Sequence, residues 1–274
     1  MKIFVAFLFV HLIAGILCSE ADKAKNTRNP EMLLETYIDM LRALRLNHLN
    51  NYDEAVKQAV IDKCKKNGGP KAFDDAKESL LSLQNSIDSL VNDTINQALL
   101  VGLESWNAQE QIPRLCDTFM TVLNSTKLAL NSVSPCLDEA ERATANIMYN
   151  MRFAAADSVC GNNGSNLISF YTARGFECII SHYPRNCSVQ MPPRNNSTVL
   201  TDGVRIAGAP WSYETSYPSL NECKSIRTAK ICAVEKLSGC EQPEPASVAN
   251  SGYAAVEKAA GCENILNAEA SSAA

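Results

Sequence analysis

Cysteine is the residue type whose number and spacing could carry the most chemistry in this chain. The sequence holds eleven cysteines. Cys18 lies in an apolar N-terminal stretch, and ten follow it: Cys64, Cys116, Cys136, Cys160, Cys178, Cys187, Cys223, Cys232, Cys240 and Cys262. In an exported chain, an even count of this kind predicts five disulfide bonds, whose connectivity the sequence leaves open.

The cysteine pattern does not favour a metal site. No C-x-x-C pair occurs, and the only histidines beyond residue 19 are His48 and His182. Structural zinc sites usually take their ligands in close pairs of cysteine or histidine. We therefore expect no bound metal.

His182 is the best-placed candidate for a catalytic base, but the groups that would support it are missing. A catalytic triad needs a serine or cysteine nucleophile and an orienting carboxylate. No G-x-S-x-G motif is present, and the cysteines are expected to be oxidised. The acidic pairs Asp74-Asp75 and Asp138-Glu139 open predicted helices, where they complement the helix dipole. We expect no enzyme activity, no catalytic residues and no cofactor.

Sequons for N-linked glycosylation are frequent. The N-x-S/T pattern occurs at Asn92, Asn124, Asn163, Asn186, Asn195 and Asn196. In an exported chain these asparagines accept glycans where they are exposed. Asn163 and Asn196, which fall in predicted loops, are the best candidates.

The N-terminus has the layout of a secretory signal peptide. Lys2 precedes an apolar run, Ile3–Leu17, which small and polar residues follow. We take residues 1–19 as the signal, and the run falls short of the roughly 20 residues that span a bilayer. The sequence therefore predicts a secreted, extracellular protein without stable membrane insertion.

Charge excludes one class of partner. The chain has 25 Lys and Arg against 30 Asp and Glu, for a net charge of −5. A nucleic-acid binder should carry a basic face. We expect no nucleic-acid partner.

The elements that must position the cysteines are helices. Apolar residues recur at helical spacing, and several of these runs open at a proline. The pattern predicts helices at 30–46, 52–66, 70–101, 113–130, 135–159, 166–180, 219–239 and 245–260. The fold class is thus an all-α, disulfide-laced bundle of about seven or eight helices with one long irregular loop.

The predicted helices form one disulfide-rich domain, residues 20–262. Two subdomains that meet near residues 160–187 are the alternative. The irregular loop spans residues 184–217, with a short strand at 198–206. We expect residues 263–274 to be a mobile Ala/Ser tail.

Two features suggest partners. The apolar seams Leu80/Leu83/Ile87/Leu90 and Leu115/Val122 form either plain core or the lining of a cavity for a small apolar ligand. In the loop, Trp211, Tyr213 and Tyr217 could anchor an extracellular protein.

The order of the cysteine motifs resembles the insect 27-kDa haemolymph glycoprotein family over residues 52–262. The resemblance is carried by Asp62-Lys63-Cys64, Val91-Asn92-Asp93-Thr94, Leu115-Cys116, Ser134-Pro135-Cys136-Leu137-Asp138, Phe176-Glu177-Cys178, Asn221-Glu222-Cys223, Ile231-Cys232-Ala233-Val234-Glu235, Cys240-Glu241-Gln242-Pro243 and Cys262. It implies a secreted, disulfide-rich, glycosylated body-fluid protein and brings no catalytic residues.

The resulting expectation is a secreted, non-enzymatic haemolymph-type glycoprotein that either carries a small apolar ligand or acts as an abundant component of the body fluid. The alternative is a secreted interaction, effector or immune module that binds a protein or cell surface through the 184–217 loop.

Overall fold

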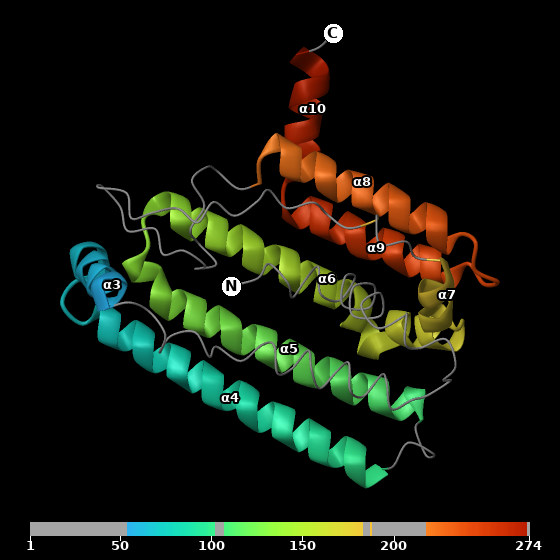
Figure 1. Cartoon of the computed structure of the whole chain (residues 1–274), viewed down its shortest axis with the longest axis horizontal. Helices are drawn as coiled ribbons and strands as arrows, with labels where there is room; N and C mark the ends of the chain where they lie inside the picture. Colours follow the sequence, from blue (N-terminus) through green and yellow to red (C-terminus); the bar gives the residue numbers. More distant parts are fainter. Residues whose placement is uncertain (1–53, 102–106, 183–186, 188–217, 273–274) are drawn as a thin grey trace.

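A computed structural model describes residues 54–101, 107–182, 187 and 218–272, and all regular structure in these ranges is helical (Figure 1). The first half contains α3 (Glu54–Gly68), α4 (Ala72–Val101), α5 (Ala108–Val133), the 3-10 turn η3 (Ser134–Cys136) and α6 (Glu139–Thr172). The second half contains α7 (Gly175–His182), α8 (Leu220–Leu237), α9 (Glu244–Ala259) and α10 (Cys262–Ser272). The predicted all-α, disulfide-laced fold is confirmed.

Five long helices lie side by side in the order α4, α5, α6, α9, α8, and each runs opposite to its neighbour (Figure 1). The short helix α3 covers one end of the row, α7 lies at the other end, and α10 projects from the end of α9. The chain order differs from the spatial order because α9, and not α8, packs against α6. The outermost helices of the row are therefore α4 and α8.

Side-chain caps fix where two helices begin. Ser219 accepts a hydrogen bond from the backbone N–H of Glu222, whose carboxylate accepts one from the N–H of Ser219 at 2.6 Å. This capping box starts α8. Asp138 and Glu141 form a second capping box at the start of α6.

The start of α5 differs from the prediction. The helix begins at Ala108, because the Asn107 side chain accepts a hydrogen bond from the N–H of Gln109. Pro113 therefore lies inside the helix, in its second turn. The proline costs one backbone hydrogen bond there, which the packing of the following turns outweighs.

The two helices predicted at 135–159 and 166–180 are divided differently. Pro135 belongs to η3, and α6 continues to Thr172 with a break at Gly161–Gly164. Asn162, Asn163 and Gly164 adopt left-handed backbone angles, with φ of 50°, 59° and 74°. A separate helix, α7, begins at Gly175 after Arg174, which also has positive φ.

The C-terminal segment, which we expected to be a mobile tail, is helical over most of its length, and its mobility stays a prediction. α10 runs from Cys262 to Ser272, with Leu266 buried against the helices beside it. An ion pair joins Lys224 of α8 to Glu269 of α10. Alanine and glutamate favour helix, and the buried leucine gives this helix a contact with the core.

The buried residues form separate clusters along the row. The largest lies among α6, α7, α8, α9 and α10 and includes Met148, Met151, Phe170, Ile226 and Tyr253. A second joins α3, α4, α5 and η3 around Cys64 and Cys136. A third fills the α5–α6 contact around Ile112, Cys116 and Cys160. A disulfide thus lies in each of these three clusters, whereas a smaller cluster of Phe119, Leu123 and Ala156 contains no cysteine.

Several predicted features fall outside the described residues. They are the signal peptide at 1–19, the helix at 30–46, the loop at 184–217 except for Cys187, and the strand at 198–206.

Candidate functional site

Five disulfides join the ten cysteines beyond residue 18. The pairs are Cys64–Cys136, Cys116–Cys160, Cys178–Cys240, Cys187–Cys232 and Cys223–Cys262. Each bond connects different segments: α3 to η3, α5 to α6, α7 to the turn after α8, Cys187 to α8, and α8 to the start of α10. All ten sulfurs therefore serve as covalent cross-links and none remains as a thiol nucleophile.

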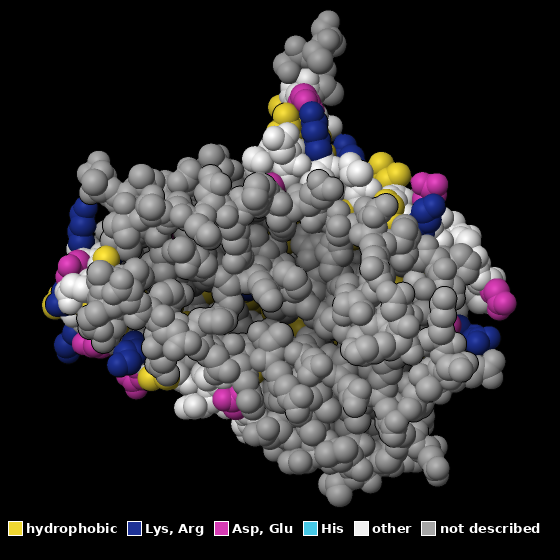
Figure 2. Space-filling model, in the orientation of Figure 1, with side chains coloured by type: hydrophobic (Ala, Val, Ile, Leu, Met, Phe, Trp, Pro, Cys, Tyr) yellow, Lys and Arg dark blue, Asp and Glu magenta, His cyan; other side chains and the backbone are white. Residues whose placement is uncertain are grey.

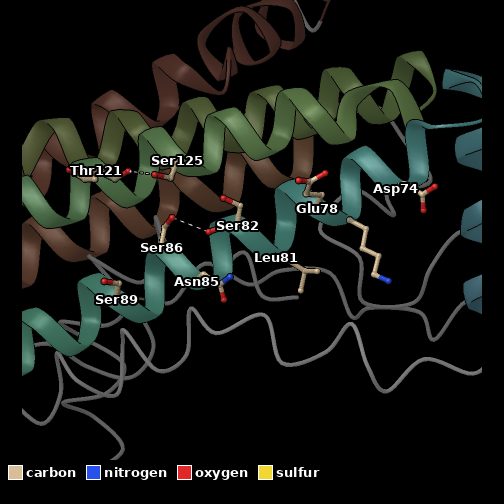
Figure 3. Close-up of a pocket in the computed structure, with 10 residues that line it drawn as sticks. Asp74, Glu78, Leu81, Ser82, Asn85, Ser86, Ser89, Thr121 and Ser125 are labelled. Carbon is tan, nitrogen blue, oxygen red and sulfur yellow. Dashed lines mark hydrogen bonds between the residues drawn. The ribbon is translucent and has the colours of Figure 1, made fainter.

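An open groove of about 870 Å³ runs along α4 and its boundary with α5 (Figure 3). α4 contributes Asp74, Lys77, Glu78, Leu81, Ser82, Asn85, Ser86 and Ser89, and α5 contributes Thr121 and Ser125. Leu81, half exposed, is the one apolar residue among these ten. The lining residues are therefore mostly polar in type, although carbon atoms of their side chains contribute more of the groove surface than nitrogen and oxygen atoms do.

The groove presents more hydrogen-bond acceptors than donors. Ser86 donates its hydroxyl hydrogen to the carbonyl oxygen of Ser82 at 2.9 Å, and Ser125 donates to that of Thr121 at 3.0 Å (Figure 3). Thr121 in turn donates to the carbonyl oxygen of Asp117 at 2.8 Å. Because these hydrogens are used within the helices, the hydroxyl oxygens offer lone pairs to a ligand.

The carboxylates in the groove add to its acceptor character. Asp74 and Glu78 both line it, whereas Lys77 is the single cation among the ten lining residues. These three side chains are exposed, so water screens their charges. The groove is therefore suited to a ligand with N–H or ammonium donors.

The apolar seams predicted on α4 and α5 face the interior. Leu83, Ile87 and Val122 are buried, and Leu80 packs against the cluster around Cys64. Leu115 is half-buried. The side chain of Leu90 lies outside the described residues. Apart from half-buried Leu115, the described seam residues are accordingly packed as core.

Lys63 links α3 to the start of α6. Its ammonium forms an ion pair with the buried carboxylate of Glu141 and lies 3.6 Å from that of Asp138. Desolvation raises the pKa of Asp138, but the N–H of Glu141 and the charge of Lys63 outweigh it, so the pKa falls below its ordinary value. Lys65 and Lys66 remain in the last turn of α3, where positive charge suits the helix dipole.

Glu257 is a second buried carboxylate held by cations. It lies on α9 and accepts hydrogen bonds from Arg227 and Lys230 of α8, both at 3.1 Å. Sequence reasoning missed this cluster and the Lys63–Glu141 pair. Arg227 and Lys230 lie three residues apart on one face of α8, and this spacing is the only sign of the cluster in the local sequence. Their partner, Glu257, lies on another helix and could not be inferred from that spacing.

The predicted glycan acceptors divide into three groups. Asn124 is exposed on α5, and Asn163 is exposed in the break within α6. Asn92 is a residue of α4, but its side chain is not described. The described ranges do not include Asn186, Asn195 or Asn196. Asn124 and Asn163 are thus on the described surface.

The remaining candidates contribute no assembled site. His182 is the last residue of α7, and its side chain lies outside the described residues. Asp74 and Asp75 lie in the first turn of α4, as predicted. Within the described ranges no group of three metal-ligating side chains comes together, and no described helix is long and apolar enough to cross a membrane.

Charges of both signs are interspersed around the edge of the face in Figure 2. Lys and Arg side chains lie beside Asp and Glu side chains there. On the coloured atoms of this face there is no continuous basic stripe of the kind that tracks a phosphate backbone.

The sequence profile of a family described as "Protein of unknown function (DUF1397)" matches residues 50–262. This chain belongs to the DUF1397 family. This chain is also similar to the "27 kDa hemolymph glycoprotein" of Manduca sexta, with 22% identity over 204 aligned residues. The alignment covers 72% of this chain and 81% of the Manduca sexta protein. No solved structure matches it.

The predicted resemblance to the insect 27-kDa haemolymph glycoprotein family is thereby confirmed. The DUF1397 match begins at residue 50 and ends at Cys262. It therefore includes all ten bridged cysteines and both described, exposed sequon asparagines.

Proposed function

We propose that this protein is a secreted, non-enzymatic glycoprotein of a body fluid. The observation that carries the proposal is the bonding of all ten cysteines beyond residue 18 into five disulfides. Such bonds form and persist in oxidising compartments. The similarity to a hemolymph glycoprotein supports the same compartment.

The absence of catalysis is supported by how the polar side chains are used. Cysteines carry cross-links, and the buried carboxylates Glu141, Glu222 and Glu257 are bound in helix caps and ion pairs. A general acid or base needs a polar group that can face a substrate. Glu141 and Glu257 instead join neighbouring helices, and Glu222 caps the start of its own helix.

Secretion is tested by expressing the full-length chain in insect cells, beside a variant without residues 1–19. We expect the full-length protein in the medium, where an N-glycosidase lowers its apparent mass. The shortened variant should stay inside the cells without that shift. A full-length chain that remains intracellular would overturn the proposal.

We further propose that the protein carries a ligand, with the α4–α5 groove as its site. The ligand class shifts from the wholly apolar one expected from the sequence to an amphipathic one. Leu81 offers an apolar contact, and the carboxylates of Asp74 and Glu78 with the hydroxyl oxygens offer acceptors. An apolar chain that ends in an amine or ammonium group fits this combination.

Native mass spectrometry of the secreted protein tests the carrier role, with extraction of any bound molecule. We expect a bound amine-containing lipid or similar amphiphile that is lost in Leu81→Ser. Ile231→Ser is the matched control, because Ile231 is a similarly exposed apolar residue of α8 and does not line the groove. No bound molecule, or equal retention by both variants, would contradict the proposal.

The interaction module is the second candidate, and the anchoring of residues 188–217 favours it. Cys187, which precedes them, is bonded to Cys232 of α8, and Pro218, which follows them, is buried. A chain segment whose two ends are fixed on a rigid scaffold is a common binding element. Trp211→Ala, Tyr213→Ala and Tyr217→Ala should abolish binding to a cell surface without changing the circular dichroism spectrum. Unchanged binding would remove this candidate.

A further inference from the structure

Leu128, near the C-terminal end of α5, is unusually exposed for a leucine within a long helix. It is 68% exposed, more than Leu81 at 50% or Ile231 at 62%. Its neighbours one turn along the helix surface are polar, because Asn124 precedes it by four residues and Asn131 follows it by three, both exposed. Leu128 is thus an apolar side chain on an otherwise polar helix face.

Asn124 supplies a covering group for that leucine. It begins the sequon Asn124-Ser125-Thr126, and side chains four residues apart lie one above the other on a helix. We propose that an N-linked glycan on Asn124 folds over Leu128 and shields it from other protein surfaces. This inference rests on the proposed secretion, because glycosylation occurs only in the secretory compartment.

The groups around Asn124 suit a sugar. Thr121 lies one turn before it, is exposed, and has already donated its hydroxyl hydrogen to the carbonyl oxygen of Asp117. Its oxygen therefore remains as an acceptor for a sugar hydroxyl. The C–H face of a sugar ring can cover the methyl groups of Leu128 while the ring hydroxyls stay in water.

The modification must precede the folding of α5. The Asn124 amide nitrogen attacks C1 of an oligosaccharide carried on a lipid pyrophosphate. The C–N bond forms, the bond from C1 to the pyrophosphate oxygen breaks, and the amide loses a proton. The transferase recognises asparagine and threonine of the sequon together. In folded α5, residues two apart point to different sides, and Thr126 donates its hydroxyl hydrogen to the carbonyl oxygen of Val122.

Two features of the chain provide controls. Asn163 is an exposed sequon asparagine in the break of α6, away from Leu128 in sequence and on another helix. Ile231 is an exposed apolar residue of α8 whose exposed α8 neighbours include no sequon. Loss of the Asn163 glycan should therefore leave Leu128 covered, and changing Ile231 should be independent of any glycan.

The test uses the secreted full-length protein with Asn124→Gln, Asn163→Gln and the double variant Asn124→Gln/Leu128→Ser. Glycopeptide mass spectrometry measures the occupancy of each site, and sedimentation velocity measures self-association. We expect Asn124 to be occupied, N124Q to self-associate at concentrations where N163Q and the wild type do not, and the double variant to return to wild-type behaviour. N124Q/I231S should still self-associate.

Other results would overturn the inference and are distinguishable from failure of the proposed function. If Asn163 carries a glycan and Asn124 does not, only the proposed cover over Leu128 is overturned. If no asparagine carries a glycan, both this cover and the proposed secreted glycoprotein are overturned. The glycan does not cover Leu128 if N124Q self-associates no more than N163Q does. The same conclusion follows if N124Q self-associates and the added L128S substitution does not reverse that association. A dimer of the glycosylated protein that L128S dissociates would assign Leu128 to a second copy of the chain.

If N124Q is not secreted, enzymatic removal of glycans from the folded wild type replaces it. The treated wild type should self-associate, and treated Leu128→Ser should not. Equal behaviour of the two treated proteins overturns the inference.

Discussion

At the scale of single residues, three buried carboxylates show how a small number of charges is accommodated inside a helical protein. Glu141 and Glu222 each complete a capping box, and Glu257 receives two cations from α8. Burying an ionised carboxylate is unfavourable unless it is paired and hydrogen-bonded. Each of these three residues meets that condition through a helix terminus or a neighbouring helix.

Replacing Glu141 by glutamine isolates its ion pair with Lys63. Glutamine can still accept the hydrogen bond of the capping box, but it carries no charge for Lys63. We expect a loss of about 1–2 kcal/mol in the free energy of unfolding, measured with urea. Glu139→Gln is the control, because Glu139 is exposed in the same turn and should cost less than about 0.5 kcal/mol. Equal losses would show that the pair with Lys63 contributes nothing.

Asp138 makes stability depend on pH in acid. Its pKa is lower in the folded protein than in the unfolded chain, so ionised Asp138 stabilises the fold above the unfolded pKa of about 3.9. That contribution disappears as the pH falls through the folded pKa. Asp138→Asn keeps a helix-capping side chain but does not titrate.

We therefore expect a smaller loss of unfolding free energy for D138N than for the wild type between about pH 5 and about pH 2. Urea unfolding at a series of pH values measures the difference. Parallel curves would contradict the assigned role of Lys63 and of the Glu141 N–H.

The residues of these clusters were only partly predictable from sequence. Ser219 and Glu222 match the S-x-x-E capping-box pattern, which can be recognised in the sequence because both partners lie within one turn. Asp138 and Glu139 were assigned to a first helical turn, but the partner of Asp138 is Glu141. The contact of Glu141 with Lys63 joins residues 78 positions apart, and no local pattern encodes such a contact.

At the scale of elements, the break in α6 determines where the chain turns from the long helical row toward α7. Three consecutive residues adopt left-handed angles there, and Cys160 immediately before the break is bonded to Cys116. A Cβ atom on Gly164 would lie 2.9 Å from Ile112 and 3.3 Å from the Cys116 sulfur. Glycine is required at this position both for its backbone angles and for the close approach of α5.

Gly164→Ala should be more destabilising than Gly261→Ala. Both glycines have nearly the same positive φ, 74° and 73°, but a Cβ on Gly261 would meet nothing within 4 Å. The backbone strain of about 1 kcal/mol is therefore common to both variants. We expect an additional cost of about 1–2 kcal/mol for G164A from overpacking, measured by urea unfolding. Equal costs would contradict the packing of Gly164 against α5.

Helix existence was more predictable than helix boundaries. Periodicity placed α3, α4, α8 and α9 within a few residues of their observed bounds. The predicted start of α5 at Pro113 was wrong, because a proline can also be tolerated within a helix when tertiary packing compensates for the lost hydrogen bond. The break at Gly161–Gly164 depends on the contact of Gly164 with α5, and α10 depends on burial of Leu266. Neither the break in α6 nor α10 can be predicted from local sequence, because each depends on contacts between segments that are distant in the chain.

At the scale of the whole molecule, the disulfides are distributed unequally between the two ends of the row. α8 is held by two bonds, Cys187–Cys232 and Cys223–Cys262, whereas α4 contains no cysteine and relies on packing against α3, α5 and η3. Each bond closes a chain segment of 39 to 72 residues. Loops of that length correspond to about 4 kcal/mol of stabilisation per bond in the chain-entropy description.

This inequality predicts different local stabilities at the two ends. Backbone amides in the middle of α4 should exchange with deuterium faster than those in the middle of α8, because two disulfides restrain the local opening of α8 and none lies within α4. Hydrogen exchange with mass spectrometry on the oxidised protein measures both. After reduction the two helices should exchange at similar rates. Slower exchange in α4 than in α8 before reduction would contradict the account.

The number of cross-links was predictable from the sequence, and the pairing of the cysteines was not. An even count of cysteines and an apolar N-terminus are local properties of the sequence. Which cysteine meets which depends on the order of helices in the row, where α9 is inserted between α6 and α8. Ten cysteines at irregular spacings leave that order open.

Disulfide mapping of the secreted protein tests the central claim most directly. Proteolysis without reduction, followed by mass spectrometry of the linked peptides, should give Cys64–Cys136, Cys116–Cys160, Cys178–Cys240, Cys187–Cys232 and Cys223–Cys262, with no free thiol among these ten. Several alkylatable thiols in the unfolded, unreduced protein, or a different set of linked peptides, would contradict both the architecture and the extracellular role.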